Sequence, residues 1–465
     1  MLGFKRTLRI KILNQPGIFG KVTDTVGSFG GSLGNINIVR MGHKYRIRDL
    51  EIYTTTQNQF EEILWKMRDI KEIKILEVFD DILKLHKGGM IEVRNKVNFD
   101  DIENFGKYYI PGIAEVASLI EEDKEKVYEY TNVGNVVGVV SNGTSLLNFK
   151  KSACAEATYT VMEGLAAVIN KFSGVSAMPF VVSTENKEEF VNTVKNIYKS
   201  FGMIILEDIS SPASIEIEEE LQGLGIPVID TNRYGNAIVT LSALINIAKK
   251  VNIDLQNSKV GIIGFGSKSV GICRMLKAYG VEEIIAADLK EDAVARMEKY
   301  GAVPASFNEV MNKSNIVIAA SRVAGLIKFG MVKQNQIILA LSKPNPEIEP
   351  EIAMKAGALY AVDGKKLSPL LAVPGLIKGT MLARAKEITT QMMITAAEAI
   401  AQLAEDGAIL PQLFDKDLHE KVAEAVKQAA IDDGMANLWE IDIEDEKDDN
   451  AHELLNSLSE DWAVS

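Results

Sequence analysis

Cysteine and histidine are scarce in this chain of 465 residues. The two cysteines, Cys154 and Cys273, cannot form a disulfide framework, and we expect a reducing, cytoplasmic environment. The chain has only four histidines. A structural zinc site built from Cys and His ligands is therefore excluded.

Long apolar runs are missing as well. No stretch of about 18 apolar residues occurs, so we expect no membrane span. The N-terminus MLGFKRTLRIKIL lacks the apolar core of a signal peptide. The net charge of −13 argues against general nucleic-acid binding. A hydrophobic content of 47% and a charged content of 25% are typical of a soluble globular protein, and the length suggests two to four domains.

The last segment, residues 439–465, is strongly acidic. We expect it to be a disordered, solvated tail. The less favoured alternative is that its apolar residues bind a partner; these are Leu454, Leu455 and Trp462.

The stretch from Lys259 to Asp288 predicts a nucleotide-binding strand, turn, helix and second strand. A short apolar run is followed by Gly264, Gly266 and Ser269 at GxGxxG spacing, with Ser in the third glycine position. Apolar residues then recur at helical spacing, and a second apolar run ends at Asp288. This is the context that gives a GxGxxG match its meaning. A βαβ unit without a nucleotide is the alternative.

The chemistry of such a turn concerns an anion at a helix N-terminus. Glycine backbone lets a pyrophosphate approach the free N–H groups there, and we add Ser267 and Ser321 as candidate contacts. Asp288 lies 24 residues after Gly264 (288 − 264), where it can accept a hydrogen bond from a ribose hydroxyl. This favours NAD as the cofactor.

Two basic residues near this turn leave NADP open. Lys268 and Lys290 lie close in sequence to the turn and to the acidic residue, where either could bind a 2′-phosphate.

Residues 1–80 show a βαββαβ order of predicted elements, which indicates a ferredoxin-like sandwich. The loop Asn14–Gly20 before the first helix and the Gly-Gly turn after it resemble an ACT domain. The resemblance implies pairing through sheets and an amino-acid ligand near that loop. An ACT domain that only dimerises is an equally open interpretation.

The rest of the chain predicts an α/β protein. We expect an α/β N-terminal domain over residues 81–245 and a Rossmann-type, doubly wound nucleotide domain over 246–403. C-terminal helices are expected over 404–438. Thr380–Leu403 is predicted to be one long amphipathic helix.

Six stretches between about residues 87 and 403 resemble malic enzymes of the compact bacterial type, in the order of that family. They are YYIPGIAEV (108–116), KVYEYTNVGNVVGVVSNGTS (126–145), VMEGLAAVINKFSGV (161–175), MIILEDISSPASIEIEEEL (203–221), GIPVIDTNRYGNAIVTLSAL (225–244) and LLAVPGLIKG (370–379).

The resemblance implies oxidation of malate with NAD or NADP and release of carbon dioxide. It implies a divalent metal that polarises the carbonyl as it forms, together with a base and an acid. Tyr109 matches the family's acid, and Glu207 and Asp208 match two metal ligands. Asn232 could offer one neutral oxygen to the metal. The family also implies a homodimer or a larger assembly.

Several positions depart from the family pattern. The family's lysine base falls on Leu165, and two of its aspartates become Thr231 and Asn232. Because leucine cannot carry a proton and threonine cannot replace a carboxylate, malate chemistry with a metal is doubtful. The other departures are Asn142, NFKKSA (148–153), Lys343 and Ser368-Pro369.

The replacements add positive charge. We predict that Arg233 and Lys343 face an anionic ligand, with Lys343 acting as a new base or as a clamp. We expect Lys150 and Lys151 to point into solvent.

Three functional hypotheses follow. The first is a malic-enzyme-like, NAD-linked oxidoreductase with a rewritten substrate site, acting on an anionic 2-hydroxy acid other than malate. The second is a catalytically inactive homologue that regulates by binding a nucleotide or effector. The third is an ordinary NAD-dependent malic enzyme.

Overall fold

The computed structural model describes residues 4–96, 105–146 and 155–437. The acidic tail, Lys150 and Lys151 lie outside these described residues. The chain forms two compact units, one ending at Asn95 and the other beginning at Lys96. The finer domain boundaries predicted from the sequence remain predictions. No helix among the described residues is long and apolar enough to cross a membrane.

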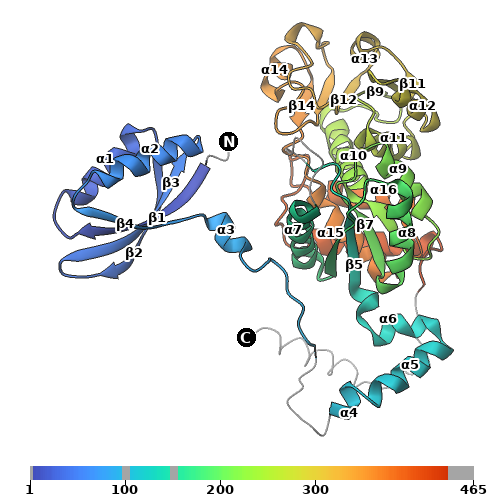
Figure 1. Ribbon diagram of the computed structural model, residues 1–465. Helices are drawn as coiled ribbons and strands as arrows, with labels where there is room; N and C mark the ends of the chain where they lie inside the picture. The colour runs from blue at the N-terminus through green and yellow to red at the C-terminus, as the bar shows by residue number, and fades with distance from the viewer. Residues whose placement is uncertain (1–3, 97–104, 147–154, 438–465) are drawn as a thin grey trace. The chain divides into compact units, whose positions relative to one another are not determined.

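The first unit has the predicted βαββαβ order. Its antiparallel sheet has the strand order β2-β3-β1-β4, and helices α1 and α2 cover one face, as Figure 1 shows. Alternating residues such as Leu8 and Ile10 on β1 and Leu50 on β3 are fully buried against those helices. The ferredoxin-like fold is thus observed. The elements are β1 (Phe4–Leu13), α1 (Ile18–Ser28), β2 (Ser32–Met41), β3 (Tyr45–Thr54), α2 (Gln57–Arg68) and β4 (Ile73–Phe79), followed by α3 (Asp81–His86).

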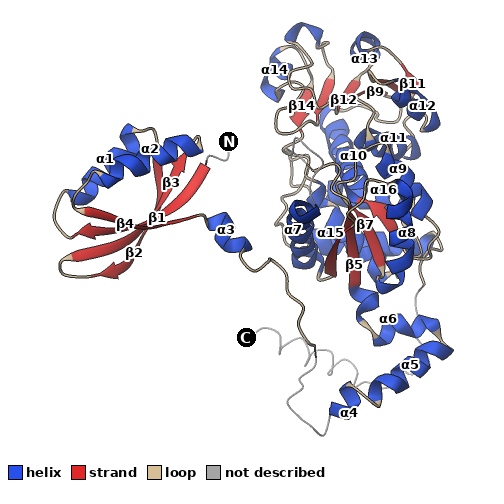
Figure 2. Cartoon of the chain, in the orientation of Figure 1, coloured by secondary structure: helices blue, strands red, loops and turns tan. Residues whose placement is uncertain are grey.

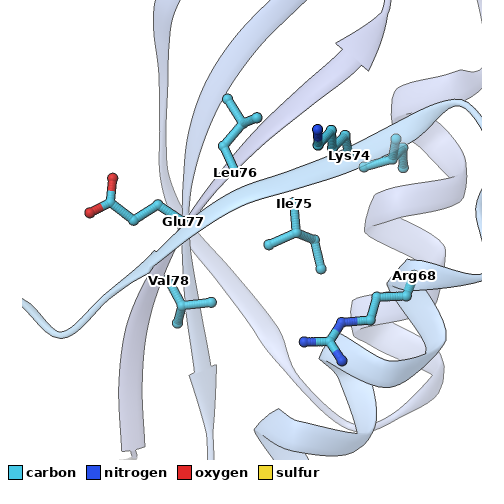
Figure 3. Close-up of a pocket in the computed structure, with 7 residues that line it drawn as sticks. Arg68, Lys74, Ile75, Leu76, Glu77 and Val78 are labelled. Carbon is cyan, nitrogen blue, oxygen red and sulfur yellow. The ribbon is translucent and has the colours of Figure 1, made fainter.

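A depression of about 500 Å³ lies on the edge strand of this unit. Figure 3 shows Arg68 from the end of α2 beside the β4 residues that line it, Ile73–Val78. This depression is not lined by the loop Asn14–Gly20, where the ACT resemblance implies a ligand. An amino-acid ligand at that loop stays a prediction.

The second unit begins with short helices and a parallel four-stranded sheet, called here the β5 sheet, with the order β6-β5-β7-β8. Crossover helices connect its strands, as Figure 2 shows. The elements are α4 (Phe105–Tyr108), α5 (Gly112–Glu122), α6 (Val127–Tyr130), β5 (Val136–Ser141), α7 (Ala155–Ser173), β6 (Ser176–Val181), α8 (Lys187–Ile197), β7 (Met203–Leu206), α9 (Ala213–Leu221) and β8 (Val228–Asp230).

A second parallel sheet, called here the β9 sheet, has six strands in the order β11-β10-β9-β12-β13-β14. The order reverses between β9 and β12, so a ligand is expected beyond the carboxyl ends of those strands. The doubly wound prediction is confirmed. The elements are β9 (Lys259–Ile263), α11 (Ser267–Ala278), β10 (Glu283–Ala287), α12 (Glu291–Lys299), β11 (Val303–Pro304), α13 (Phe307–Lys313), β12 (Ile316–Ala319), β13 (Ile337–Ala340), α14 (Pro350–Lys355) and β14 (Tyr360–Asp363).

One long helix, α10 (Thr231–Val251), joins the two sheets and lies between them in Figure 1. It is buried along almost its whole length and packs against α11 and against α16 (Thr390–Gln402). A continuous apolar core therefore runs through both sheets and the C-terminal helices, which include α15 (Val373–Leu382) and α17 (Leu418–Asp432).

The prediction of one helix over Thr380–Leu403 is wrong. Helix α15 ends at Leu382, and Arg384 has a left-handed backbone with φ 47°. A new helix, α16, begins after Thr389, whose hydroxyl accepts a hydrogen bond from the Met392 N–H at 3.0 Å. Apolar periodicity continues across the break because both helices bury one face in the same core.

Candidate functional site

Glu207 and Asp208, called here the acidic pair, directly follow strand β7. Because β8 is the parallel neighbour of β7, the residues after it meet the acidic pair at one sheet edge. The Thr231 hydroxyl donates to Oε2 of Glu207. The Asn232 side-chain amide donates to Oδ1 of Asp208 at 3.2 Å. The structure therefore brings together all three residues predicted as metal ligands.

The acidic pair resists ionisation. Burial raises the pKa of Glu207 to about 8, although the hydrogen bond from Thr231 opposes the rise. Burial also raises the pKa of Asp208, while Asn232 and the Arg322 guanidinium oppose that shift. Glu207 is thus mostly a neutral acid at pH 7.

These residues do not fit the resident divalent metal that the family resemblance implies. Hard cations such as Mg²⁺ are held by several oxygens, usually with ionised carboxylates. In the described part of the chain, no group of three or more His, Cys, Asp or Glu side chains converges on one point. Here an alcohol and an amide occupy the places of two carboxylates.

The raised pKa of Glu207 predicts a pH-dependent stability. The native state binds this proton until about pH 8, whereas the unfolded chain releases it near pH 4.5. The stability that this group contributes is therefore complete below about pH 4.5 and is lost as the pH rises through about 8. Between these values, Glu207→Gln should remove a slope of up to about 1.4 kcal/mol per pH unit. Denaturant unfolding of both proteins from pH 5 to 9 measures the difference. Parallel pH profiles would show that Glu207 is ionised in the native state.

Arg233 does not face a ligand, which corrects the prediction made for it. Its side chain is 1% exposed and forms ion pairs with Glu218 and, at 3.1 Å, with Asp230. Its Nε also donates to the hydroxyl of Ser267 at 3.0 Å. A buried guanidinium needs such partners, and their carboxylates neutralise its charge, so the charge is not available to a ligand. Arg233 instead joins the start of α10 to the start of α11.

The predicted nucleotide turn has the expected geometry. Gly264 has φ +82°, and a Cβ added there would lie 2.8 Å from the Ala320 carbonyl oxygen. Gly266 precedes the first residue of α11, and a Cβ added at Gly266 would meet nothing within 4 Å. Ser269 is buried and donates to the Gly264 carbonyl at 2.5 Å, so it fills the packing role of the third glycine.

Other predicted cofactor contacts are already engaged in the protein. Asp288 accepts hydrogen bonds from the Phe265 N–H at 2.6 Å and the Lys290 N–H at 2.9 Å. The N–H and the hydroxyl of Ser321 both donate to Oε1 of Glu347. These bonds order the two loops on either side of the turn, and their roles toward a cofactor stay predictions.

The remaining predicted catalytic residues lie apart from the acidic pair in sequence and element. Tyr109 follows α4 and is 54% exposed, and neither α4 nor α5 contains a buried residue. Lys343 follows β13 and is exposed, and burial of its amine nevertheless lowers its pKa. Leu165 lies on α7 and packs against the shared apolar core. The position where the family has its lysine base therefore carries no group that can accept a proton.

Nothing in the sequence indicated that Lys268 lies in a cluster of positive charge. Lys268, in the first turn of α11, has its pKa lowered to about 8 by burial and by the neighbouring charges of Lys343 and Arg322. Its position just after the glycine turn was visible, but the approach of the other two cations was not.

The chain is similar to several known proteins. Residues 240–324 match the family "D-isomer specific 2-hydroxyacid dehydrogenase, NAD binding domain". The chain is 40% identical over 429 residues to NAD-dependent malic enzyme 1 of Bacillus subtilis, covering 92% of this chain and 98% of that protein. It is 31% identical to the NAD-dependent malic enzyme of Geobacillus stearothermophilus, covering 92% and 95%. The solved malic enzyme of Pyrococcus horikoshii shares 31% identity at a TM-score of 0.72, covering 77% and 91%.

Proposed function

Because the chain belongs to the malic enzyme family, we propose that it binds NAD and oxidises an anionic 2-hydroxy acid related to malate. The observation that carries this proposal is the glycine turn at Gly264 and Gly266, which is open beside Gly266 and lies within the same unit as the acidic pair. Bound NAD would supply the hydride acceptor. Glycine backbone and the free N–H groups of α11 would hold its pyrophosphate, and Asp288 would meet a ribose hydroxyl.

The substrate side must work with the residues present. Glu207 as a neutral acid and Asn232 as an amide can donate hydrogen bonds to a substrate oxygen, which a metal would otherwise bind. Nearby cations would orient the substrate's carboxylates. Tyr109 remains the predicted proton donor to the product.

Ordinary malate oxidation with a divalent metal is the second candidate. The 40% identity to a named NAD-dependent malic enzyme over nearly the whole chain favours it. It requires the acidic pair to ionise and Asn232 to supply a metal-binding oxygen. The lost base at Leu165 weighs against it, since a missing positioned base costs about 10²–10⁴-fold in rate.

An assay of the full chain separates these candidates. NADH or NADPH formation would be followed with malate and with a panel of 2-hydroxy acids, each with Mn²⁺ or with EDTA. We expect turnover that prefers NAD and survives EDTA, with malate at least about 10²-fold slower than the best acid. Turnover of malate that depends on Mn²⁺ would instead establish the ordinary enzyme. NAD binding without any turnover would leave the regulatory homologue.

We also infer that the first unit is an ACT-like module and that the protein is a homodimer or larger. The ferredoxin-like fold supports the first inference. Edge strand β2 supports the second, because Ile38, Val39 and Met41 are about half exposed or more. Light scattering of the full chain tests the assembly, and thermal-shift measurements with amino acids test the module.

A further inference from the structure

Three basic residues, called here the cation cluster, follow three adjacent strands of the β9 sheet. Lys268 lies in the first turn of α11 after β9, Arg322 follows β12, and Lys343 follows β13. These strands are neighbours in the order β9-β12-β13. Since carboxyl ends of parallel strands share one edge, the cluster borders the crevice where the strand order reverses.

The cluster lies on one side of that crevice. Asp288, which ends the β10 segment, marks the opposite side, where the resemblance places the adenosine ribose. The second half of a dinucleotide extends toward β12 and β13. The cation cluster is therefore on the side where the nicotinamide and the substrate would meet.

The charges of the cluster are not compensated by ion pairs. Among the residues that the structure describes, none forms a salt bridge with Lys268, Arg322 or Lys343. The charges of Lys343 and Arg322 both lower the pKa of Lys268, so each of them lies close enough to Lys268 to act on it. Acidic neighbours offset this only in part, since Glu347 and Asp363 act through space without pairing.

One member of the cluster, Arg322, also acts on the acidic pair. The Arg322 charge opposes the rise in the pKa of Asp208, so the guanidinium lies within electrostatic range of that carboxyl. Three cations without ion pairs in the described part of the chain give this edge of the β9 sheet an excess of positive charge that a single substrate carboxylate does not balance.

We propose that Lys268, Arg322 and Lys343 bind a dianionic acid group, of phosphate or phosphonate type, on the substrate of this cleft. This rests on the proposed function for the identity of the cleft. It makes Lys343 a clamp rather than a base. A guanidinium and two ammonium groups match the three oxygens of such a group, with Arg322 able to bond two of them.

Two small probes test the proposal without turnover. Phosphonoacetate and malonate differ only in carrying a phosphonate or a second carboxylate. Their affinities for the full chain would be measured by titration calorimetry at fixed ionic strength, with and without NAD. We expect phosphonoacetate to bind at least about ten-fold more tightly than malonate, and this preference to fall as salt is added.

Charge-removing variants locate the effect. Arg322→Gln and Lys343→Gln change exposed side chains and should each weaken phosphonoacetate about ten-fold while keeping the melting temperature. Lys355→Gln is the matched control, because Lys355 is exposed and ends α14, the helix that leads into the amino end of the parallel strand β14, whereas the cation cluster follows the carboxyl ends of the strands. Equal affinities for the two probes, or unchanged phosphonoacetate binding in both variants, would overturn the proposal. Failure of the proposed function would appear separately, as absent turnover with the probe preference retained.

Discussion

Replacing Arg233 by methionine is expected to destabilise the protein by about 3–5 kcal/mol. The substitution leaves Glu218 and Asp230 buried without their cation, and both carboxylates already have raised pKa values because of burial. It also removes the bond to Ser267 that joins α10 to α11. Denaturant unfolding of the full chain at pH 7.5 measures the loss.

A triple variant that removes all three charges distinguishes the loss of ion pairs from the loss of packing. In the triple variant Arg233→Met, Glu218→Gln and Asp230→Asn, no buried charge is left unpaired, and we expect most of the lost stability to return. The single variant should also lose more stability as the pH rises, since its unpaired carboxylates must ionise. A single variant within about 0.5 kcal/mol of the native chain would show that the three groups are not a buried ionic network in solution.

Gly266→Ala is expected to abolish tight NAD binding while leaving the fold intact. The backbone of Gly266 has φ −84°, which alanine adopts freely, and an added Cβ meets nothing within 4 Å. The open space is where a pyrophosphate would approach α11, so a methyl group there should weaken NAD at least about ten-fold. Calorimetric titration with NAD and a melting curve measure the two effects.

Gly264→Ala is the matched contrast to this variant. Its left-handed backbone and the close approach of Ala320 and Ser321 make any Cβ strained before NAD is added. We expect a lowered melting temperature here, in addition to weak NAD binding. If Gly266→Ala bound NAD as the native chain does, the dinucleotide would not lie against this turn.

The local architecture follows from the sequence alone. Alternating apolar residues such as Leu8 and Ile10 identified strands, and the glycines at Gly264 and Gly266 identified the turn between β9 and α11. Such patterns depend only on which face of a single helix or strand is buried, so they can be recognised without knowledge of the rest of the fold. The order of these elements also predicted both the ferredoxin-like unit and the doubly wound sheet.

Only the tertiary structure decided where each charge lies. Arg233 read as a free cation, but Glu218 from α9 meets it in the core, and the sequence carries no sign of that approach. Lys268 and Lys343 are 75 residues apart (343 − 268) and come together because parallel strands end at a shared edge. The energy of an ionisable group depends on its desolvation and on charges that the fold brings from distant segments. Neither can be inferred from the periodicity of the helix or strand that carries the group.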